Sequence, residues 1–197
     1  MFNTDLYFNK LNEECGVFGI YSKNCDSISR LIYFGLVTLQ HRGQESAGIA
    51  AYKNGKIQYY KDMGLVREVF NDNILSRLNG DIGIGHVRYS TTGESYITNA
   101  QPLVVHYKGG AIALAHNGNL VNADKIREEL EDNGSIFQTS IDSEVIANLI
   151  ARYYSLGYKE AIIKAAKKIK GAFALTIICE GKMIGVVGGV GPYAGLD

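Results

Sequence analysis

Hydrophobic and polar positions follow two different patterns along this 197-residue chain. Short apolar stretches rich in β-branched and aromatic residues, bounded by turn residues, predict strands. Apolar positions that recur every three or four residues predict amphipathic helices. The predicted strands cover residues 15–21, 47–52, 56–61, 81–89, 103–107, 111–116, 173–179 and 182–187, and the predicted helices cover residues 26–40, 122–132, 142–155 and 159–170.

The dipeptides between neighbouring strands favour tight hairpins. They are Asn54-Gly55, Gly109-Gly110 and Glu180-Gly181, and glycine supplies the positive φ that such turns need. Hairpins come first, helices follow, and a hairpin closes the chain. This order predicts an α+β fold in which helices pack on antiparallel sheets, and it argues against an alternating parallel sheet.

Polar residues with short side chains stand at the expected starts of three helices. Asp26 or Ser27 is placed to cap the first, Asn122 the second and Asp142 the third. Each of these side chains can accept a hydrogen bond from a free backbone N–H of the first helical turn. We therefore expect the helices to begin at these positions.

The charge balance is neutral, with Lys plus Arg and Asp plus Glu both at 20. A chain without net charge has no long-range attraction for nucleic acid or an anionic membrane, so neither is expected as a partner. The N-terminal residues lack the basic and apolar regions of a signal peptide, which favours the cytoplasm. Cys15, Cys25 and Cys179 form no CxxC pair, so we expect no structural metal site.

Cys15 is the first residue with candidate chemistry. Taken alone, a cysteine at the start of a strand is more often a small core residue than a nucleophile. The polar segment 1–14 before it changes this balance. If that segment is removed as a propeptide, the α-amine of Cys15 has a pKa of about 8 and can serve as the base for its own thiol.

Arg88 lies in GHVRYSTTG, beside Tyr89 and close to Thr91. An arginine at a strand end can hold a carboxylate in a bidentate contact, and neighbouring hydroxyls can assist. The plainer interpretation is a solvated arginine at a polar strand end, since most arginines are exposed.

Three further positions each have a plain interpretation beside a chemical one. Asn117 and Gly118 suit an ordinary turn, or an oxyanion hole made of a side-chain amide and a backbone N–H. Asp142 suits a helix cap, and its carboxylate can also bind an ammonium group. Arg42 follows a helix and is typical of a C-terminal turn. Together, a nucleophile, a carboxylate clamp, an oxyanion hole and an ammonium clamp suit attack on the side-chain amide of a free amino acid such as glutamine.

These residues lie in segments that resemble a known family. In chain order the segments are ECGVFGI, LQHRGQESAGIA, GHVRYSTTG, NAQPL, AHNGNL and DSE, and the match runs from about residue 15 to about residue 186. This set resembles the class II glutamine amidotransferases, which are N-terminal-nucleophile hydrolases, and among them the amidophosphoribosyltransferase family. The resemblance implies a glutamine amidotransferase domain over 15–186 with the four-layer αββα sandwich.

The resemblance also implies roles for individual residues. It makes Cys15 the nucleophile, Asn117 and Gly118 the oxyanion hole, Arg88 with Thr91 the site of the glutamine α-carboxylate, and Asp142 the site of the α-ammonium. Arg42, His86 and Tyr89 are expected to shape the same pocket. The implied reaction releases ammonia from glutamine for the first step of purine synthesis, in which a separate phosphoribosyltransferase domain forms 5-phosphoribosylamine. Full-length members use magnesium, some carry an iron–sulfur cluster, and they form homo-oligomers; we expect no cofactor within this chain.

The last residues depart from the family. Residues 187–197 form a glycine-rich tail, and MIGVVGGVGPYAGLD resembles the first strand and turn of aspartate/glutamate racemases. We therefore expect a C-terminally truncated amidotransferase domain. Two alternatives stay open: a catalytically inert truncated or fused fragment, and another kind of class II glutamine amidotransferase.

Overall fold

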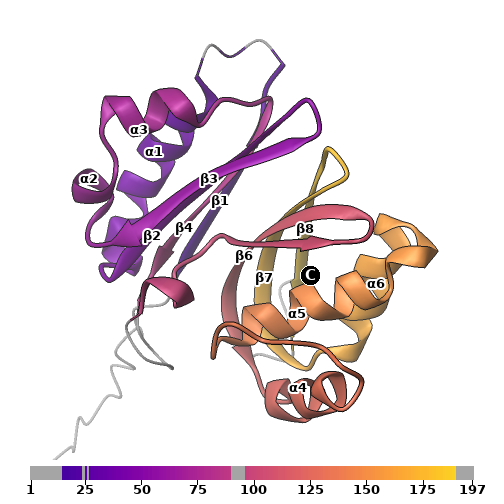
Figure 1. Cartoon of the computed structure of the whole chain (residues 1–197). Coiled ribbons are helices and arrows are strands. Elements are labelled where there is room, and N and C mark those ends of the chain that lie inside the picture. The colour runs from indigo at the N-terminus through magenta and orange to yellow at the C-terminus, as the bar shows by residue number, and fades with distance from the viewer. Residues whose placement is uncertain (1–14, 24, 26, 90–95, 190–197) are drawn as a thin grey trace, which may run out of the picture.

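Two four-stranded antiparallel sheets form the centre of the protein. The computed structural model describes residues 15–23, 25, 27–89 and 96–189. Sheet A has the order β1 (Gly16–Tyr21), β4 (Ile82–Arg88), β2 (Ser46–Lys53) and β3 (Lys56–Met63). Sheet B has the order β5 (Leu103–Tyr107), β6 (Gly110–Leu120), β7 (Gly171–Cys179) and β8 (Lys182–Gly188). Figure 1 shows the two sheets side by side, each with its own helices.

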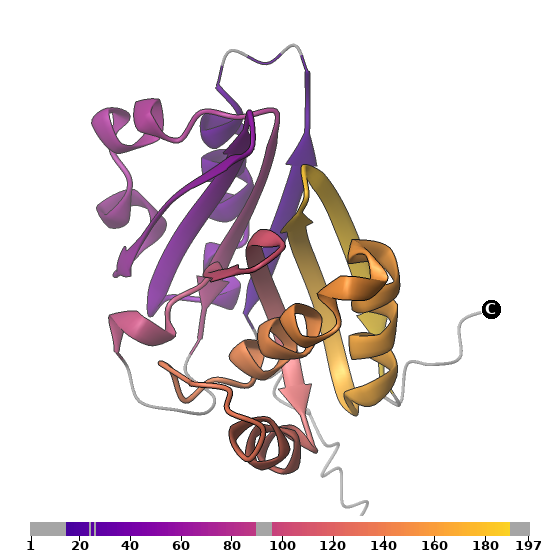
Figure 2. The same ribbon diagram turned by 45° about the vertical axis from the view of Figure 1, so that its right-hand side comes forward.

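The helices cover the outer faces of the two sheets. α1 (Ile28–Thr38), α2 (Val66–Val69) and α3 (Asp72–Arg77) share a hydrophobic cluster with sheet A. α4 (Ala123–Glu131), α5 (Asp142–Arg152) and α6 (Tyr158–Lys168) share another with sheet B. Short 3₁₀ turns lie at Gln40–Arg42, Ile97–Asn99 and Tyr154–Leu156. Figure 2 shows the resulting layers, and the expected αββα sandwich is confirmed.

Small side chains allow these layers to approach closely. Between the sheets, Ala50, Ala113 and Ala115 pack with buried isoleucines. On the outer face of β4, a Cβ atom added to Gly83 or Gly85 would lie 2.3 or 2.5 Å from a side-chain carbon of Ile32 in α1. Such a separation is far below van der Waals contact, so these two glycines set the distance between α1 and sheet A.

The predicted strands and the four predicted helices are all present, with ends that differ by a few residues. The short helices α2 and α3 were not predicted. The prediction that Asp142 caps α5 is wrong by one position, because Ile141 is the N-cap and Asp142 is the first helical residue. Asn122 does occupy the N-cap of α4, but its side chain makes no cap hydrogen bond and instead bonds the Lys168 carbonyl and the Lys170 N–H.

Within the described part of the chain, β8 has a neighbouring strand on one side only. A groove of about 470 Å³ lies between α6 and the strands β7 and β8, and its lining includes Ile162, Phe173, Ile184 and Val186. Val187 is 86% exposed. The described helices include none with the length and apolar character needed to cross a membrane.

Candidate active site

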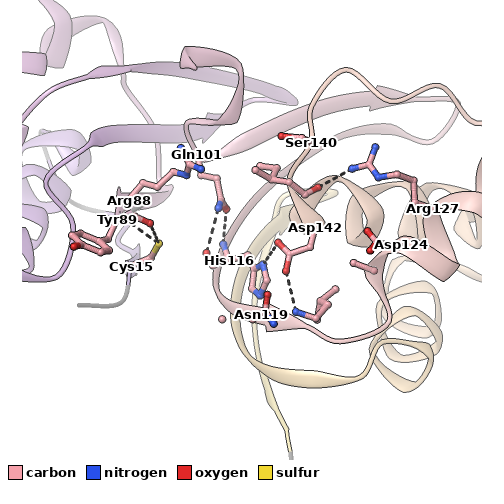
Figure 3. A pocket seen from close by; sticks show the side chains of 14 residues that line it. Cys15, Arg88, Tyr89, Gln101, His116, Asn119, Asp124, Arg127, Ser140 and Asp142 are labelled. Carbon is pink, nitrogen blue, oxygen red and sulfur yellow. Dashed lines mark hydrogen bonds and ion pairs between the residues drawn. The ribbon is translucent and has the colours of Figure 1, made fainter. Parts of the chain in front are cut away.

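A cavity of about 320 Å³ opens where the ends of β1 and β4 in sheet A face β6 of sheet B. Figure 3 shows its side chains converging from both sheets and from the starts of α4 and α5. Its lining is predominantly polar. The lining residues are Cys15, Arg88, Tyr89, Gln101, His116, Gly118, Asn119, Leu120, Ala123, Asp124, Arg127, Ser140, Ile141 and Asp142.

Cys15 lies immediately before β1 and packs against the end of β4. Its thiol donates to the Tyr89 carbonyl at 3.6 Å, and the Tyr89 N–H approaches Sγ at 3.4 Å. Burial raises the pKa of the Cys15 thiol above its ordinary value, although the Tyr89 backbone and the Arg88 guanidinium act in the opposite direction. A thiol held in this state needs a base before it can act as a nucleophile.

Arg88 ends β4 and is 4% exposed. Its Nη1 donates to Glu45 Oε1 at 2.6 Å, in an ion pair that is largely shielded from solvent. Glu45 comes directly before β2, which pairs with β4, so backbone pairing brings the two charges together. The guanidinium is thereby fixed at the edge of the cavity, in reach of an anionic ligand.

The opposite wall is organised around His116 and Asp142. Asp142 Oδ1 lies 3.2 Å from His116 Nδ1, and Asp142 Oδ2 accepts the Leu120 N–H at 3.1 Å. Burial alone would raise the pKa of the Asp142 carboxyl, but these contacts and the Ser143 N–H outweigh it, and the net pKa lies below its ordinary value. Asp142 therefore presents a negative charge to the cavity at neutral pH.

A second set of hydrogen bonds holds the backbone of His116. Gln101 Oε1 accepts the His116 N–H at 2.8 Å, and Gln101 Nε2 donates to the His116 carbonyl at 3.4 Å. The ring of His86 donates from Nε2 to the same carbonyl at 3.0 Å. His86 is fully buried, and burial lowers its pKa to about 3, so the ring is neutral. The strand that carries Asn117 and Gly118 is thus fixed just before these residues.

Gly118 contributes backbone to the cavity wall. Its φ is +140°, a conformation that favours glycine. A Cβ atom at this position would lie 2.1 Å from the Ala172 carbonyl oxygen on β7. The fold therefore requires glycine here, at an exposed position whose backbone faces the cavity.

The structure brings most of the predicted site residues together. Cys15, Arg88, Tyr89, Gly118 and Asp142 all line the cavity. Arg42 contacts it indirectly, because its Nε donates to the Cys15 carbonyl at 3.3 Å.

Three predicted residues are placed differently or fall outside the structure. Asn117 is partly exposed beside Gly118 and is not among the lining residues, and His86 lies beneath the cavity with no exposed surface. The ring of His86 is turned toward β6, where its Nε2 bonds the His116 carbonyl, so its role in shaping the pocket stays a prediction. Thr91 lies outside the described residues.

Several residues of the site had no role that the sequence alone predicted. Gln101 and His116 belong to the quoted segments NAQPL and AHNGNL, and Glu45 to LQHRGQESAGIA, but no role was assigned to them. Arg127 had no signal beyond its place on a predicted helix. It donates to the Ile141 carbonyl at 3.2 Å and stacks 4.1 Å above the Phe137 ring, which fixes the loop before α5.

The part of the chain that the structure describes contains no group of three or more His, Cys, Asp or Glu side chains arranged to hold a metal ion.

Comparisons with known proteins identify similar domains. Residues 86–186 match the family described as a glutamine amidotransferase domain. The chain is 51% identical over 174 residues to an amidophosphoribosyltransferase of Methanocaldococcus jannaschii, a match that covers 87% of this chain and 37% of that protein.

Two solved structures have the same fold. The glutamine phosphoribosylpyrophosphate amidotransferase of B. subtilis, complexed with ADP and GMP, superposes with a TM-score of 0.79 at 45% identity, over 87% of this chain and 36% of that one. A structure described as the allosteric regulatory enzyme of purine biosynthesis superposes with a TM-score of 0.81 at 45% identity. The match covers 87% of this chain and 37% of that one.

The chain spans roughly a third of the length of the curated relatives that it matches. The resemblance to the amidotransferase part of amidophosphoribosyltransferases is confirmed over that region. The resemblance of the tail to racemases stays a prediction. Because the family match covers residues 86–186, more than half of the sequence, the chain belongs to the glutamine amidotransferase domain family.

Proposed function

We propose that this chain hydrolyses glutamine to glutamate and ammonia, with Cys15 as the nucleophile. The observation that carries the proposal is that Cys15, Arg88, Gly118 and Asp142 line a single cavity. They come from elements far apart in the sequence and supply a thiol, a cation, a backbone N–H and an anion. A free α-amino acid with a side-chain amide complements all four groups.

The charges of the cavity suit the two ends of such a ligand. Arg88 lies on the sheet A side, where a guanidinium can bind the α-carboxylate. Asp142, ionised and anchored by Leu120 and His116, can bind the α-ammonium. With its two charges held, glutamine would direct its side-chain amide toward Cys15. Thr91, Tyr89 and Arg42 belong to this proposal as supporting groups around the ligand and the nucleophile.

The proposed reaction uses groups of the chain and one water molecule. After removal of residues 1–14, the α-amine of Cys15 takes the thiol proton, and sulfur attacks the amide carbon. The oxyanion is stabilised by the Asn117 side chain and the Gly118 N–H. The carbon–nitrogen bond then breaks with transfer of a proton to the leaving nitrogen, which releases ammonia. Water hydrolyses the thioester, returning the thiol and glutamate.

We further propose that the ammonia serves an amidophosphoribosyltransferase reaction, the transfer to phosphoribosyl pyrophosphate that begins purine synthesis. The names of the relatives and the extent of the similarity support this assignment. The acceptor site would lie in a part that the relatives have beyond the matched third of their length. A cytoplasmic location would accord with the supply of both substrates.

Intact-mass analysis after incubation with a glutamine-mimicking diazo-ketone tests the proposal. We expect loss of residues 1–14 and one adduct on Cys15, together with ammonia release from glutamine in the untreated protein. The Cys15→Ala variant should gain no adduct. A folded chain of full mass, unmodified and without ammonia release, would show that the product is an inert fragment.

A further inference from the structure

The two sheets are joined by a hydrogen bond directly beneath the cavity. His86 on β4 of sheet A donates from Nε2 to the His116 carbonyl on β6 of sheet B, at 3.0 Å. A carbonyl oxygen only accepts, so Nε2 must carry the proton of this ring. His86 is fully buried, and its pKa of about 3 keeps it in this neutral form. The donor is therefore a neutral ring that is shielded from solvent.

Gln101 holds the same backbone position from another side. The β5–β6 pairing ends at Leu103 opposite Leu114, and in the same register Gln101 falls opposite His116. There the side-chain amide of Gln101 replaces a strand backbone, because its oxygen accepts the His116 N–H and its nitrogen donates to the His116 carbonyl. Gln101 is 5% exposed, so water competes little for these bonds.

These contacts converge on one peptide group. The His116 carbonyl belongs to the peptide that leads into Asn117, and Gly118 follows in the cavity wall. Two donors on one carbonyl restrict both the rotation of that peptide and its distance from β4. Cys15 stands on the β4 side, 3.4 Å from the Tyr89 N–H. The position of the nucleophile relative to the Asn117–Gly118 segment is thus set through His86 and Gln101.

We propose that His86 and Gln101 are positioning residues that hold Asn117 and Gly118 at the distance from Cys15 at which an oxyanion can be stabilised. This inference rests on the proposed glutamine hydrolysis. Neither side chain needs to touch the reacting atoms, and His86 lies outside the cavity lining. Stabilisation of an oxyanion depends on donors placed to within a fraction of an ångström, and a misplacement of about 1 Å can cost a factor of about 100 in rate.

The test is steady-state glutamine hydrolysis by the full chain carrying His86→Leu, His86→Gln or Gln101→Glu. Leucine fills the space without a donor, glutamine restores an N–H, and glutamate places an oxygen against the His116 carbonyl. Rates are divided by the fraction of chains that begin at Cys15, measured by intact mass. Ser29→Ala is the matched control. Ser29, on α1, also makes a buried hydrogen bond from its side chain to a backbone carbonyl, because its Oγ donates to the Leu75 carbonyl at 2.7 Å.

For His86→Leu and Gln101→Glu we expect kcat to fall by about 10- to 100-fold, with KM for glutamine changed by less than about 3-fold. His86→Gln should recover at least a third of the parent kcat, and Ser29→Ala should keep it. The rate of Cys15 alkylation by iodoacetamide needs no oxyanion hole, so it should change by less than about 2-fold in every variant.

Three results would overturn the inference. They are an unchanged kcat in His86→Leu, a kcat in His86→Gln no higher than in His86→Leu, and a loss of kcat matched by an equal loss of alkylation. A parent chain that processes and takes up iodoacetamide at Cys15 but releases no ammonia would instead refute the proposed function, so the two failures can be told apart.

Discussion

The two walls of the cavity are built in different ways. The sheet A wall comprises Cys15, Arg88 and Tyr89. Paired strands, the backbone of Tyr89 and the ion pair of Arg88 with Glu45 hold these residues in place. In the sheet B wall, comprising His116, Gly118 and Asp142 with their neighbours, side chains bond to other side chains and to the backbone.

This difference separates two tasks. The sheet A wall carries the nucleophile, and its position follows from strand pairing. The sheet B wall supplies an anion and backbone groups whose usefulness depends on their orientation. We expect the loss of Cys15 from the sheet A wall to remove the chemistry, and changes on the sheet B wall to weaken ligand binding, orientation or stability.

Cys15→Ala should produce the largest effect. Removal of the thiol takes away the proposed nucleophile, so ammonia release from glutamine should fall by at least about 1,000-fold. The free energy of unfolding should change by less than about 1 kcal/mol, because the side chain is only partly buried and small. Cys25→Ala is the control, since Cys25 is also a free, partly buried cysteine and lies outside the cavity lining. Equal losses of ammonia release in both variants would show that Cys15 is not the nucleophile.

Gly118→Ala tests the backbone of the sheet B wall. Its positive φ and the short approach to the Ala172 carbonyl should lower the free energy of unfolding by about 3 kcal/mol. Gly110 lies on the same strand with a φ of +133° and no atom within 4 Å of an added Cβ. Gly110→Ala should therefore cost only about 1 kcal/mol. If denaturant titrations give the same loss of unfolding free energy for both variants, β7 shifts to make room for the added methyl group and glycine is not sterically required at position 118.

Asp142→Asn tests the anion of the sheet B wall. An asparagine oxygen can still accept the Leu120 N–H, but the charge for the α-ammonium is lost. We expect KM for glutamine to rise by about 30-fold, which corresponds to about 2 kcal/mol, while kcat changes little. Asp124 also lines the cavity, but the contacts with Leu120 and His116 that hold Asp142 belong to Asp142. Asp124→Asn should therefore raise KM by less than about 3-fold. A larger rise in KM for Asp124→Asn than for Asp142→Asn would show that the α-ammonium binds at Asp124 on α4.

The pH dependence of stability tests the contact between the walls. The pKa of His86 is about 3 in the folded protein and near 6.5 when unfolded, so the unfolded chain gains a proton first as the pH falls. Stability from this residue is therefore present above pH 6.5 and lost on acidification, by about 1 kcal/mol between pH 6.5 and pH 5.5. His86→Gln should flatten this slope in urea titrations at the two pH values. His106→Gln, at an exposed position on β5, should leave it unchanged.

The sequence predicted the layers and the sheet A wall well. Short apolar stretches separated by glycine-containing turns predicted the hairpins, and Cys15, Arg88 and Tyr89 lie in contiguous segments whose residue types already indicate chemistry. The roles assigned to Asn117, Gly118, Arg88 and Asp142 stay predictions, although the structure places all but Asn117 in the cavity lining.

Contacts between distant elements were beyond the reach of sequence patterns. Gln101 lies opposite His116 because of the register in which β5 and β6 pair, and that register cannot be read from the sequence. His86 belongs to a motif of candidate chemistry, yet which face of β4 it occupies depends on how the sheets stack. Asp142 looked like a helix cap because its local sequence fits one, whereas tertiary contacts with Leu120 and His116 decide its position.

Among the described residues, one side of β8 has no neighbouring strand, and we expect this edge to control how the domain behaves at high protein concentration. A strand edge with unpaired backbone groups attracts other such edges, and here an apolar groove and the exposed Val187 lie beside it. Lys182 is the one charged residue of the strand. We therefore expect self-association through this edge, rather than thermal unfolding, to limit the solubility of the domain. Light scattering should increase with protein concentration well below the unfolding temperature.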